Sequence, residues 1–430
     1  PRGFRALGTA AGIKDSGARD LAVVLVDDGP AAVAATFTTN RLPAAAVRLN
    51  KEHLASTAPA GEGRYGWVEA MMSTSGCANA ATGDAGLADQ RSLAATLATH
   101  AGTTPERVLA MSTGLIGTRL PVDRVAHALT AISGSFRTDD AAYAGVAEAM
   151  RTTDSRAKAA TVVVDLPGAD GRPRRTTISG VAKGVGMIHP DMATMLAYVL
   201  TDASVRPETL SRLLRPTVAR TWNQTSIDGD QSTNDTVLLV ASGAAGAIPL
   251  EDDSEALSAF GQAVEAVARS LARQQAADGE GATTLITCRV SGGRSDADAR
   301  ATARAVVSSD LLKAAVHGAD PNWGRIAMAV GNAELASAES LEAAGLDPEA
   351  AGASAGRPVA LDPDRLQIDI EGTPVFAGVP LEYDEAVLSK RMRDGEVLIR
   401  VDLGLGEGTG EAFGCDLTCE YVIENSEYST

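Results

Sequence analysis

Residues 183–196 read KGVGMIHPDMATML, and this order of residues fits no regular helix or strand from end to end. Gly184, Gly186 and Pro190 interrupt it, because glycine favours turns and proline lacks a backbone donor. The apolar run MLAYVL nevertheless follows Thr194 directly. The residues alone support two interpretations of this junction.

The first interpretation is structural. Asp191 could cap a helix with the sequence MATMLAYVL, because aspartate is a favoured N-cap residue. Met192, Leu196 and Val199 keep roughly helical spacing behind it. On this interpretation the hydroxyl of Thr194 has no chemical role.

The second interpretation is chemical. If the chain is cut between Ala193 and Thr194, the Thr194 hydroxyl gains its own α-amino group as a general base, since such amines titrate near ~7.7 to 8.0. The small Ala193 leaves its carbonyl open to attack, and Gly184, Gly186 and Pro190 could hold the peptide in a strained turn. Spacing alone leaves both interpretations open.

Length and composition predict a large globular protein. The chain has 430 residues, which favours two core regions, and 45% hydrophobic with 22% charged residues is typical of a soluble protein. Lys and Arg number 38 against 55 Asp and Glu, a net charge of −17. We expect no nucleic-acid partner, because the basic run at 172–175 is too short to bind a polyanion.

Neither a signal peptide nor an apolar run of the ~18 residues that a membrane helix needs is recognisable, so we expect a cytoplasmic protein without a membrane partner. Four cysteines fit a reducing compartment. The pair Cys415 and Cys419 lacks a second pair and a nearby histidine, so no zinc or other metal site is predicted.

Apolar runs and breakers predict alternating blocks of strands and helices, and therefore a layered α/β or α+β architecture. Expected strands are 21–28, 31–38, 44–50, 161–166, 176–182, 283–291 and a last, half-buried antiparallel strand at 396–404. Expected helices are 87–100, 122–132, 139–151, 251–274 and 299–316. Segments 167–175 and 336–357 are expected to be loops or surface insertions.

No common nucleophile motif is present: the chain has no G-x-S-x-G elbow, no H-E-x-x-H and no phosphate-binding loop. Of five histidines, His189 and His317 lie in polar, glycine-rich stretches, where an exposed or capping role is the simplest expectation. Other such stretches are STSGCANAATG (73–83), MSTGLIG (111–117), SIDGDQSTNDT (226–236), DGEGATT (278–284) and GCDLTCEYVIENSEYST (414–430).

Taken in order, these stretches resemble the ornithine acetyltransferases, also called glutamate N-acetyltransferases. KGVGMIHPDMATML resembles the self-cleavage motif of that family, and AAGIK, FTTNR, STGLIG, TTD, SIDGDQSTNDT, DGEGAT, DPNWGRI, GCDLT and ENSEYST resemble its other signatures. The resemblance extends from Gly3 to Thr430.

The resemblance implies a layered α/β (α+β) sandwich like that of the DmpA aminopeptidases, with Ntn-like layering but different connectivity. It implies self-cleavage into an α chain (1–193) and a β chain (194–430) that begins with the nucleophile Thr194, commonly assembled as α2β2. The implied reaction takes acetyl from N-acetylornithine onto Thr194 and passes it to glutamate. No cofactor is implied.

The resemblance also implies roles for individual residues. Thr113 and the Gly114 N–H match the family's oxyanion hole, which stabilises charge that develops in the tetrahedral intermediate. The positions that match the family's substrate-binding residues are Thr152, Lys183, Thr194, Glu280, Asn425 and Thr430.

The sequence departs from the family pattern at four positions expected near the active site, Thr74, Cys77, Ala81 and Thr284. Alternative hypotheses are therefore an acyltransferase acting on another amino acid in specialised metabolism, or an amidohydrolase or aminopeptidase on the same fold. A binding protein that leaves the bond between Ala193 and Thr194 uncut is a further alternative.

Overall fold

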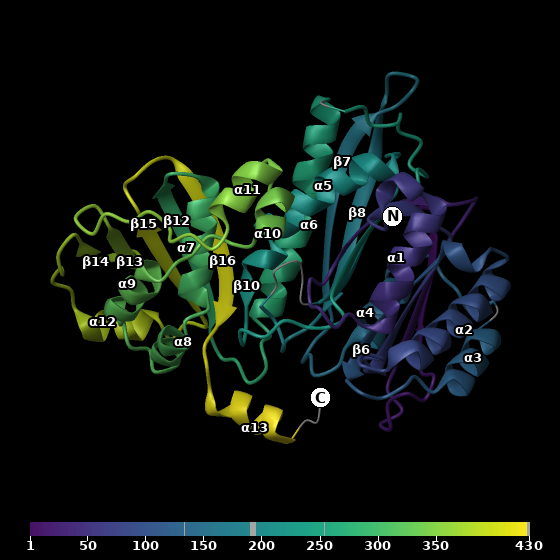
Figure 1. Cartoon of the computed structure of the whole chain (residues 1–430), viewed down its shortest axis with the longest axis horizontal. Coiled ribbons are helices and arrows are strands. Elements are labelled where there is room, and N and C mark those ends of the chain that lie inside the picture. The colour runs from purple at the N-terminus through teal and green to yellow at the C-terminus, as the bar shows by residue number, and fades with distance from the viewer. Residues whose placement is uncertain (133, 190–194, 253, 428–430) are drawn as a thin grey trace.

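The computed structural model describes residues 1–132, 134–189, 195–252 and 254–427. In Figure 1 the chain forms a larger lobe on the right, which contains the N-terminus, and a smaller lobe on the left, built from later residues. Each lobe has its own buried clusters of apolar side chains. The expectation of two core regions is therefore confirmed.

The larger lobe contains two sheets. The first has the strand order β1 (Phe4–Thr9), β2 (Leu21–Val26), β5 (Ala70–Cys77) and β6 (Val108–Leu115). The second has the order β4 (Tyr65–Val68), β3 (Ala31–Phe37), β11 (Thr236–Ala241), β9 (Leu196–Thr201), β8 (Pro173–Lys183) and β7 (Lys158–Pro167).

The smaller lobe contains the third sheet, with the order β10 (Thr225–Ser226), β16 (Gly408–Cys415), β12 (Leu285–Gly293), β15 (Glu396–Asp402), β13 (Gln367–Ile370) and β14 (Thr373–Ala377). Its core packs against α7 (Asp296–Val307), α8 (Asp310–His317), α9 (Trp323–Gly331) and α12 (Glu385–Arg391).

The remaining helices of the described chain cover or join these sheets. They are α1 (Ala45–Thr57), α2 (Gly83–Ala101), α3 (Val122–Ala131), α4 (Asp140–Met150), α5 (Pro207–Arg220), α6 (Glu255–Ala276), α10 (Ala338–Ala343), α11 (Pro348–Ser354) and α13 (Cys419–Glu427), with short 3-10 turns η1 (Pro59–Gly61), η2 (Pro105–Arg107) and η3 (Trp222–Gln224).

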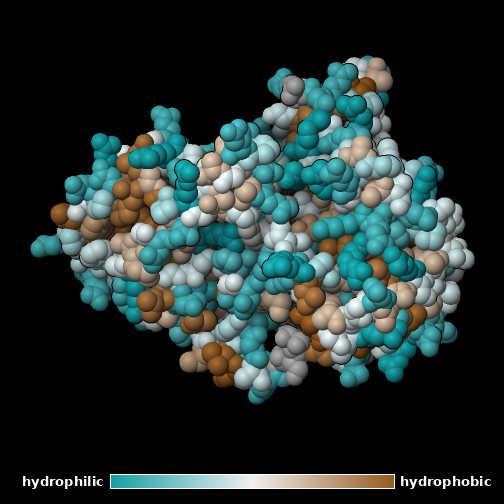
Figure 2. Space-filling model, in the orientation of Figure 1, coloured by the Kyte–Doolittle hydropathy of each residue, from teal (hydrophilic) through white to brown (hydrophobic). Residues whose placement is uncertain are grey.

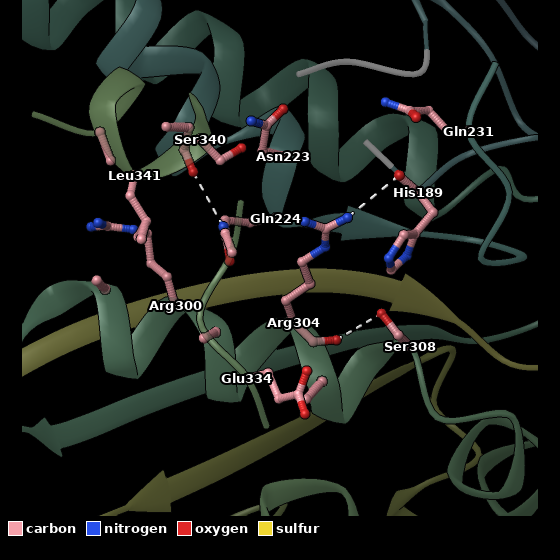
Figure 3. A pocket seen from close by; sticks show the side chains of 16 residues that line it. His189, Asn223, Gln224, Gln231, Arg300, Arg304, Ser308, Glu334, Ser340 and Leu341 are labelled. Atoms are coloured by element: carbon pink, nitrogen blue, oxygen red, sulfur yellow. Dashed lines mark hydrogen bonds between the residues drawn. The ribbon is translucent and has the colours of Figure 1, made fainter. Parts of the chain in front are cut away.

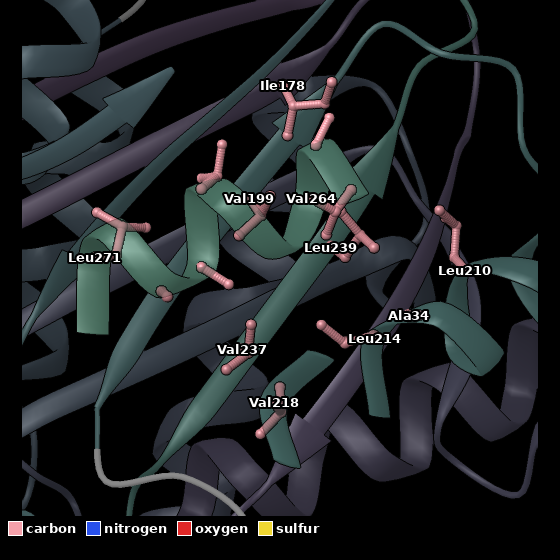
Figure 4. Packing of buried hydrophobic residues seen from close by; sticks show 14 of the residues in the cluster. Ala34, Ile178, Val199, Leu210, Leu214, Val218, Val237, Leu239, Val264 and Leu271 are labelled. Atoms are coloured by element: carbon pink, nitrogen blue, oxygen red, sulfur yellow. The ribbon is translucent and has the colours of Figure 1, made fainter. Parts of the chain in front are cut away.

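The larger lobe has four layers. Along β3, Ala32 and Ala34 pack toward α5 and α6, whereas Val33 and Ala35 pack toward the first sheet, as the two-residue period of a strand requires. Figure 4 shows the outer core, where helix residues such as Val264 face the strands. Helices α1, α2 and α3 cover the far face of the first sheet. The predicted layered α/β sandwich is confirmed.

The apolar run after Thr194 is a strand, so the capped helix is wrong from Leu196 onward. β9 lies between β8 and β11 and is buried along its whole length. A strand buried on both faces has no polar alternation, and its periodicity cannot be told from that of a buried helix. Asp191, Met192 and Thr194 lie outside the described residues.

Three other expectations were wrong. Residues 45–50 belong to α1 and not to a strand, and Ala44 is the residue before the helix. Val47, Asn50 and Leu54 lie on the buried face of α1 at helical spacing. The helix expected at 299–316 is two helices, because Ser309 caps α8 by accepting from the Leu312 N–H. The segment 336–357, expected to be a loop or surface insertion, contains α10 and α11 and is therefore not an irregular loop.

The strand expected at 396–404 is β15, and its alternating burial is confirmed. It pairs antiparallel with β13 but parallel with β12, and β16 follows it, so it is neither wholly antiparallel nor last. The other expected strands and helices are present, with boundaries shifted by a few residues.

The surface is mostly hydrophilic on the face seen in Figure 2, with hydrophobic residues scattered over it. Val422 and Ile423 on α13 are among the exposed apolar side chains. Among the described residues, no helix has the length and apolarity needed to cross a membrane.

Candidate active site

One cavity of about 220 Å³ collects most of the predicted site residues. Thr113, Gly114, Thr152, Lys183, Glu280 and Asn425 all line it. Ala193, Thr194 and Thr430 lie outside the described residues, but Met195, which follows Thr194 in the chain, lines the same cavity. Residues that are far apart in the sequence therefore meet beside the position where cleavage is predicted.

Strand ends create this cavity. Thr113 lies near the end of β6 and Lys183 is the last residue of β8, while β9 and β11 begin at the same edge because Leu196 pairs with Thr236 in parallel register. Glu280 comes from the loop after α6, and α13 carries Asn425. Both lobes contribute, so their mutual packing determines the shape of the cavity.

The backbone conformation at position 114 requires glycine. Its φ is 122°, a value that side-chain-bearing residues rarely adopt, and a Cβ there would overlap the backbone of Gly76 on the neighbouring strand. The close approach of β5 and β6 at this point therefore depends on the absence of a side chain.

Lys183 and Thr113 are in contact inside the cavity. Lys183 Nζ donates a 3.2 Å hydrogen bond to Thr113 Oγ1, and Lys183 is 8% exposed. Burial lowers the pKa of Lys183, and the nearby carboxylate of Asp154 partly offsets that effect. Because the Thr113 oxygen accepts this bond, the hydroxyl hydrogen remains available to another acceptor.

A buried ionic cluster supports the segment after Lys183. Lys158 Nζ donates to Asp154 Oδ1 at 2.7 Å and to Asp278 Oδ2 at 2.6 Å, and the Gly184 N–H donates to Asp154 Oδ1 at 2.8 Å. Burial alone would raise the pKa of Asp154, but the charges of Lys183 and Lys158 more than offset it and hold the pKa below its ordinary value. Asp154 thereby fixes the backbone at the cavity edge.

Glu280 presents an oriented carboxylate. Thr153 Oγ1 donates to Glu280 Oε1 at 2.6 Å, and Asn425 Nδ2 donates to Glu280 Oε2 at 2.9 Å. A Cβ on Gly186 would overlap this carboxylate, so glycine at 186 lets it approach the backbone. The contact with Asn425 also holds α13 against the loop that carries Glu280.

The segment before the predicted cleavage position is held by Asp228. Its carboxylate accepts from the backbone N–H groups of Met187 at 2.5 Å and Ile188 at 2.9 Å. Burial raises the pKa of Asp228, although these hydrogen bonds work in the opposite direction. Met187 has a positive φ of 54°, so the hydrogen bonds stabilise an uncommon backbone conformation.

Residues 187–189 and 230–232 form a wall between two cavities, joined by the antiparallel bridge of Ile188 with Gln231. Met187, Asp230 and Ser232 line the first cavity, whereas His189 and Gln231 line the second.

The second cavity, of about 400 Å³, is drawn in Figure 3 with Arg300 and Arg304 of α7 among its lining residues. Arg304 Nη2 lies 3.4 Å from the His189 carbonyl oxygen. None of the predicted site residues in the described chain lines it.

The two histidines have structural contacts. His189 Nδ1 lies 3.0 Å from Ser226 Oγ, and His317 Nδ1 lies 3.1 Å from Asp416 Oδ2. Asp416 also accepts from the N–H groups of Thr283 and Thr284, so it anchors the loop that carries Glu280. No cluster of metal-binding side chains occurs among residues that the structure describes.

The four departures from the family pattern lie outside the lining of the first cavity. Thr74 is buried on β5, and Cys77 Sγ contacts the Thr118 carbonyl at 3.3 Å. Ala81 has a positive φ of 57°, and the Thr284 N–H donates to Asp416. These four side chains therefore do not line the cavity.

Asp235 lines the cavity and was missed by sequence reasoning. It is 2% exposed, and its carboxylate oxygen Oδ2 is buried without a hydrogen-bond partner in the described chain. Burial raises its pKa well above the ordinary value, with Lys183 acting in the opposite direction. The available signal was an acidic residue two positions before the apolar run VLLVA (237–241).

Comparison with known proteins identifies the family. The model of the ArgJ family matches residues 5–430. This chain belongs to the ArgJ family. An arginine biosynthesis bifunctional protein ArgJ from Deinococcus radiodurans is 43% identical over 100% of this chain and 97% of its own length. The protein of the same name from Thermus thermophilus is also 43% identical, over 100% of this chain and 99% of its own length.

Among solved structures, the crystal structure of an arginine biosynthesis bifunctional protein argJ from Bacillus halodurans is 34% identical. It matches 55% of this chain and 100% of its own chain, with a TM-score of 0.47. Membership of the ArgJ family rests on the family model and on the full-length relatives. It agrees with the resemblance to the ornithine acetyltransferases noted in the sequence.

Proposed function

We propose that this protein is an acetyltransferase that moves an acetyl group from N2-acetylornithine to glutamate and serves arginine biosynthesis. Its membership of the ArgJ family supports the reaction, since the full-length relatives are named arginine biosynthesis bifunctional proteins. The observation that carries the proposal is the cavity in which Thr113, Lys183 and Glu280 meet beside Met195.

The proposed nucleophile is Thr194, released by cleavage after Ala193. The α chain (1–193) and the β chain (194–430) would stay together, because β8 and β9 on either side of the cut pair in one sheet. Assembly as α2β2 belongs to the same proposal.

In the first half-reaction, Thr194 Oγ attacks the acetyl carbonyl and its proton passes to the Thr194 amino group. The Thr113 hydroxyl and the Gly114 N–H stabilise the resulting oxyanion. The C–N bond then breaks, and ornithine leaves with the proton on its amine. In the second half, the glutamate amine attacks the acetyl ester and regenerates the Thr194 hydroxyl. The acetyl group travels on the protein, so no cofactor takes part.

The charges of the cavity fit amino-acid substrates. The ammonium of Lys183 can pair with an α-carboxylate, and the carboxylate of Glu280 can accept from a substrate ammonium. Thr152 and Asn425 add polar groups at the rim, and Thr430 is included in the proposed binding set.

The experiment measures ornithine release from N2-acetylornithine with and without glutamate, with Thr194→Ala as the inactive control. A transferase releases about one equivalent without glutamate and turns over repeatedly with it. Equal steady rates in both conditions would instead identify a hydrolase. No release in either condition would show that another acyl donor is used.

A further inference from the structure

The second cavity, drawn in Figure 3, has no role in the proposed reaction. Side chains from α5, η3, α7 and α10 line it. Its volume of about 400 Å³ lies within the range of roughly 300–1,000 Å³ that is typical of small-molecule sites. The cavity is therefore large enough to hold a small metabolite.

The lining of this cavity is positively charged. Arg300 and Arg304 lie one turn apart on α7, and Figure 3 shows both side chains rising from the helix. Among the described residues that line the cavity, Glu334 is the one acidic side chain, and it is exposed. Because the whole protein has a net charge of −17, this local positive charge makes the cavity a place where an anion is favoured.

Arg300 is available to a ligand. Within the part of the chain that the structure describes, its guanidinium has neither a hydrogen bond nor an ion pair. Burial lowers the pKa of Arg300, and the charge of Asp296 partly offsets this effect. A partly buried cation without a partner has lost solvation, and an anion beside it would compensate for that loss.

Gln224 supplies an acceptor in the same cavity. It is 7% exposed, and its Nε2 donates to the Ala219 carbonyl at 3.2 Å. Since only the amide nitrogen can donate, this bond fixes which way the amide points. Oε1 is buried without a hydrogen-bond partner in the described chain, which costs stability. A ligand with an N–H or O–H group would satisfy this oxygen.

We propose that the second cavity binds a small carboxylate that carries a neutral amide N–H or hydroxyl group next to the carboxylate. The carboxylate accepts from Arg300, and the neutral group donates to Gln224 Oε1. The apolar part of the ligand packs against Ala297 and Ala301, which also line the cavity. An ammonium is disfavoured as the donor, because Arg300 and Arg304 both carry positive charge. This site does not rest on the proposed function.

The test uses four compounds with one carbon skeleton and measures their binding by titration calorimetry. α-Hydroxyisovalerate has both required groups, and without an acetyl group it cannot act as an acetyl donor. Isovalerate lacks the hydroxyl, α-hydroxyisovaleramide lacks the charge, and valine has an ammonium in place of the hydroxyl. α-Hydroxyisovalerate should bind at least about tenfold more tightly than each of the others. No binding of this compound, or equal binding of any other, would overturn the proposal.

Variants locate the bound compound. Arg300→Gln should weaken the binding of α-hydroxyisovalerate at least about tenfold, and Gln224→Met should abolish its advantage over isovalerate. Arg289→Gln is the matched control, because it removes the same charge from a half-exposed position on β12 that does not line the cavity. Lys183→Met removes the cation of the first cavity and should leave binding unchanged.

Two results would contradict this location. Unchanged binding in Arg300→Gln would overturn the proposal, as would a loss of binding in Lys183→Met alone, which would place the compound in the first cavity. If a variant does not fold, a crystal structure of the wild-type protein with α-hydroxyisovalerate decides. The compound between Arg300 and Gln224 supports the proposal, and its absence from the second cavity contradicts it.

Discussion

Lys183 donates a hydrogen bond to the hydroxyl of Thr113 across 3.2 Å, although the two residues are 70 positions apart and lie on different sheets. The contact joins the edges of the two sheets at the cavity. It also assigns the direction of the Thr113 hydroxyl, since an oxygen that accepts from an ammonium is free to donate its own hydrogen elsewhere.

Removal of this hydroxyl tests the proposed oxyanion hole. Thr113→Ala should lower kcat on the order of 100-fold or more, because the lost donor acts on charge that is present only in the transition state. KM should change little, and Thr113→Ser should retain most of the rate. Steady-state kinetics with N2-acetylornithine and glutamate measure both, and an unchanged kcat for Thr113→Ala would remove Thr113 from the mechanism.

Gly186→Ala tests the placement of Glu280. The added Cβ would overlap the Glu280 carboxylate and push it away from Thr153 and Asn425. We expect activity to fall at least tenfold, on the order of 1.4 kcal/mol in the transition state, with little change in thermal stability, because the displaced atoms end a flexible side chain.

The matched control is Gly331→Ala. Gly331 lies on α9, and an added Cβ there meets nothing within 4 Å. This change should leave activity intact and stabilise the helix by about 1 kcal/mol or less. Equal kinetics for the two variants would contradict the described contact between Gly186 and Glu280.

Lys158→Met tests the buried ionic cluster. Lys158 is 0% exposed and bonds both Asp154 and Asp278, so its loss leaves two buried carboxylates without their cation. We expect a loss of about 3–5 kcal/mol in the free energy of unfolding, as for other broken buried ion pairs. Urea unfolding measures it, and a loss below about 1 kcal/mol would mean that the cluster is not stabilising.

The same cluster predicts a pH dependence. The pKa of Asp154 is depressed in the folded protein, so its stabilising contribution is present in full above the ordinary value of 3.8 and is lost as the pH falls through the lower folded pKa. Asp154→Asn should therefore unfold with a shallower loss of stability below about pH 4. Identical acid-unfolding curves for the two proteins would contradict this.

The sequence predicted the layered fold because most strands and helices have a clear periodicity of hydrophobic residues. The prediction of individual elements failed where this periodicity fits both a helix and a strand. Leu196 begins a strand that is buried on both faces, and the alanines around Val47 fit either a strand or a helix until their neighbours are known.

Some residues of the candidate site could be predicted from the sequence and others could not. The motif around Thr194 was predicted from the chemistry of an N-terminal hydroxyl residue together with the family resemblance. Asp235, and the pairing of Lys158 with Asp278 across 120 positions, were not. A single buried carboxylate is not part of a motif with a recognisable spacing between residues. Its contacts become visible only in the folded structure.

The most direct test of the central claim is the intact mass of the purified protein under denaturing conditions, before and after addition of N2-acetylornithine. We expect two fragments divided between Ala193 and Thr194, and one added acetyl group on the fragment that begins with Thr194. A single uncut chain of 430 residues that gains no acetyl group would contradict it.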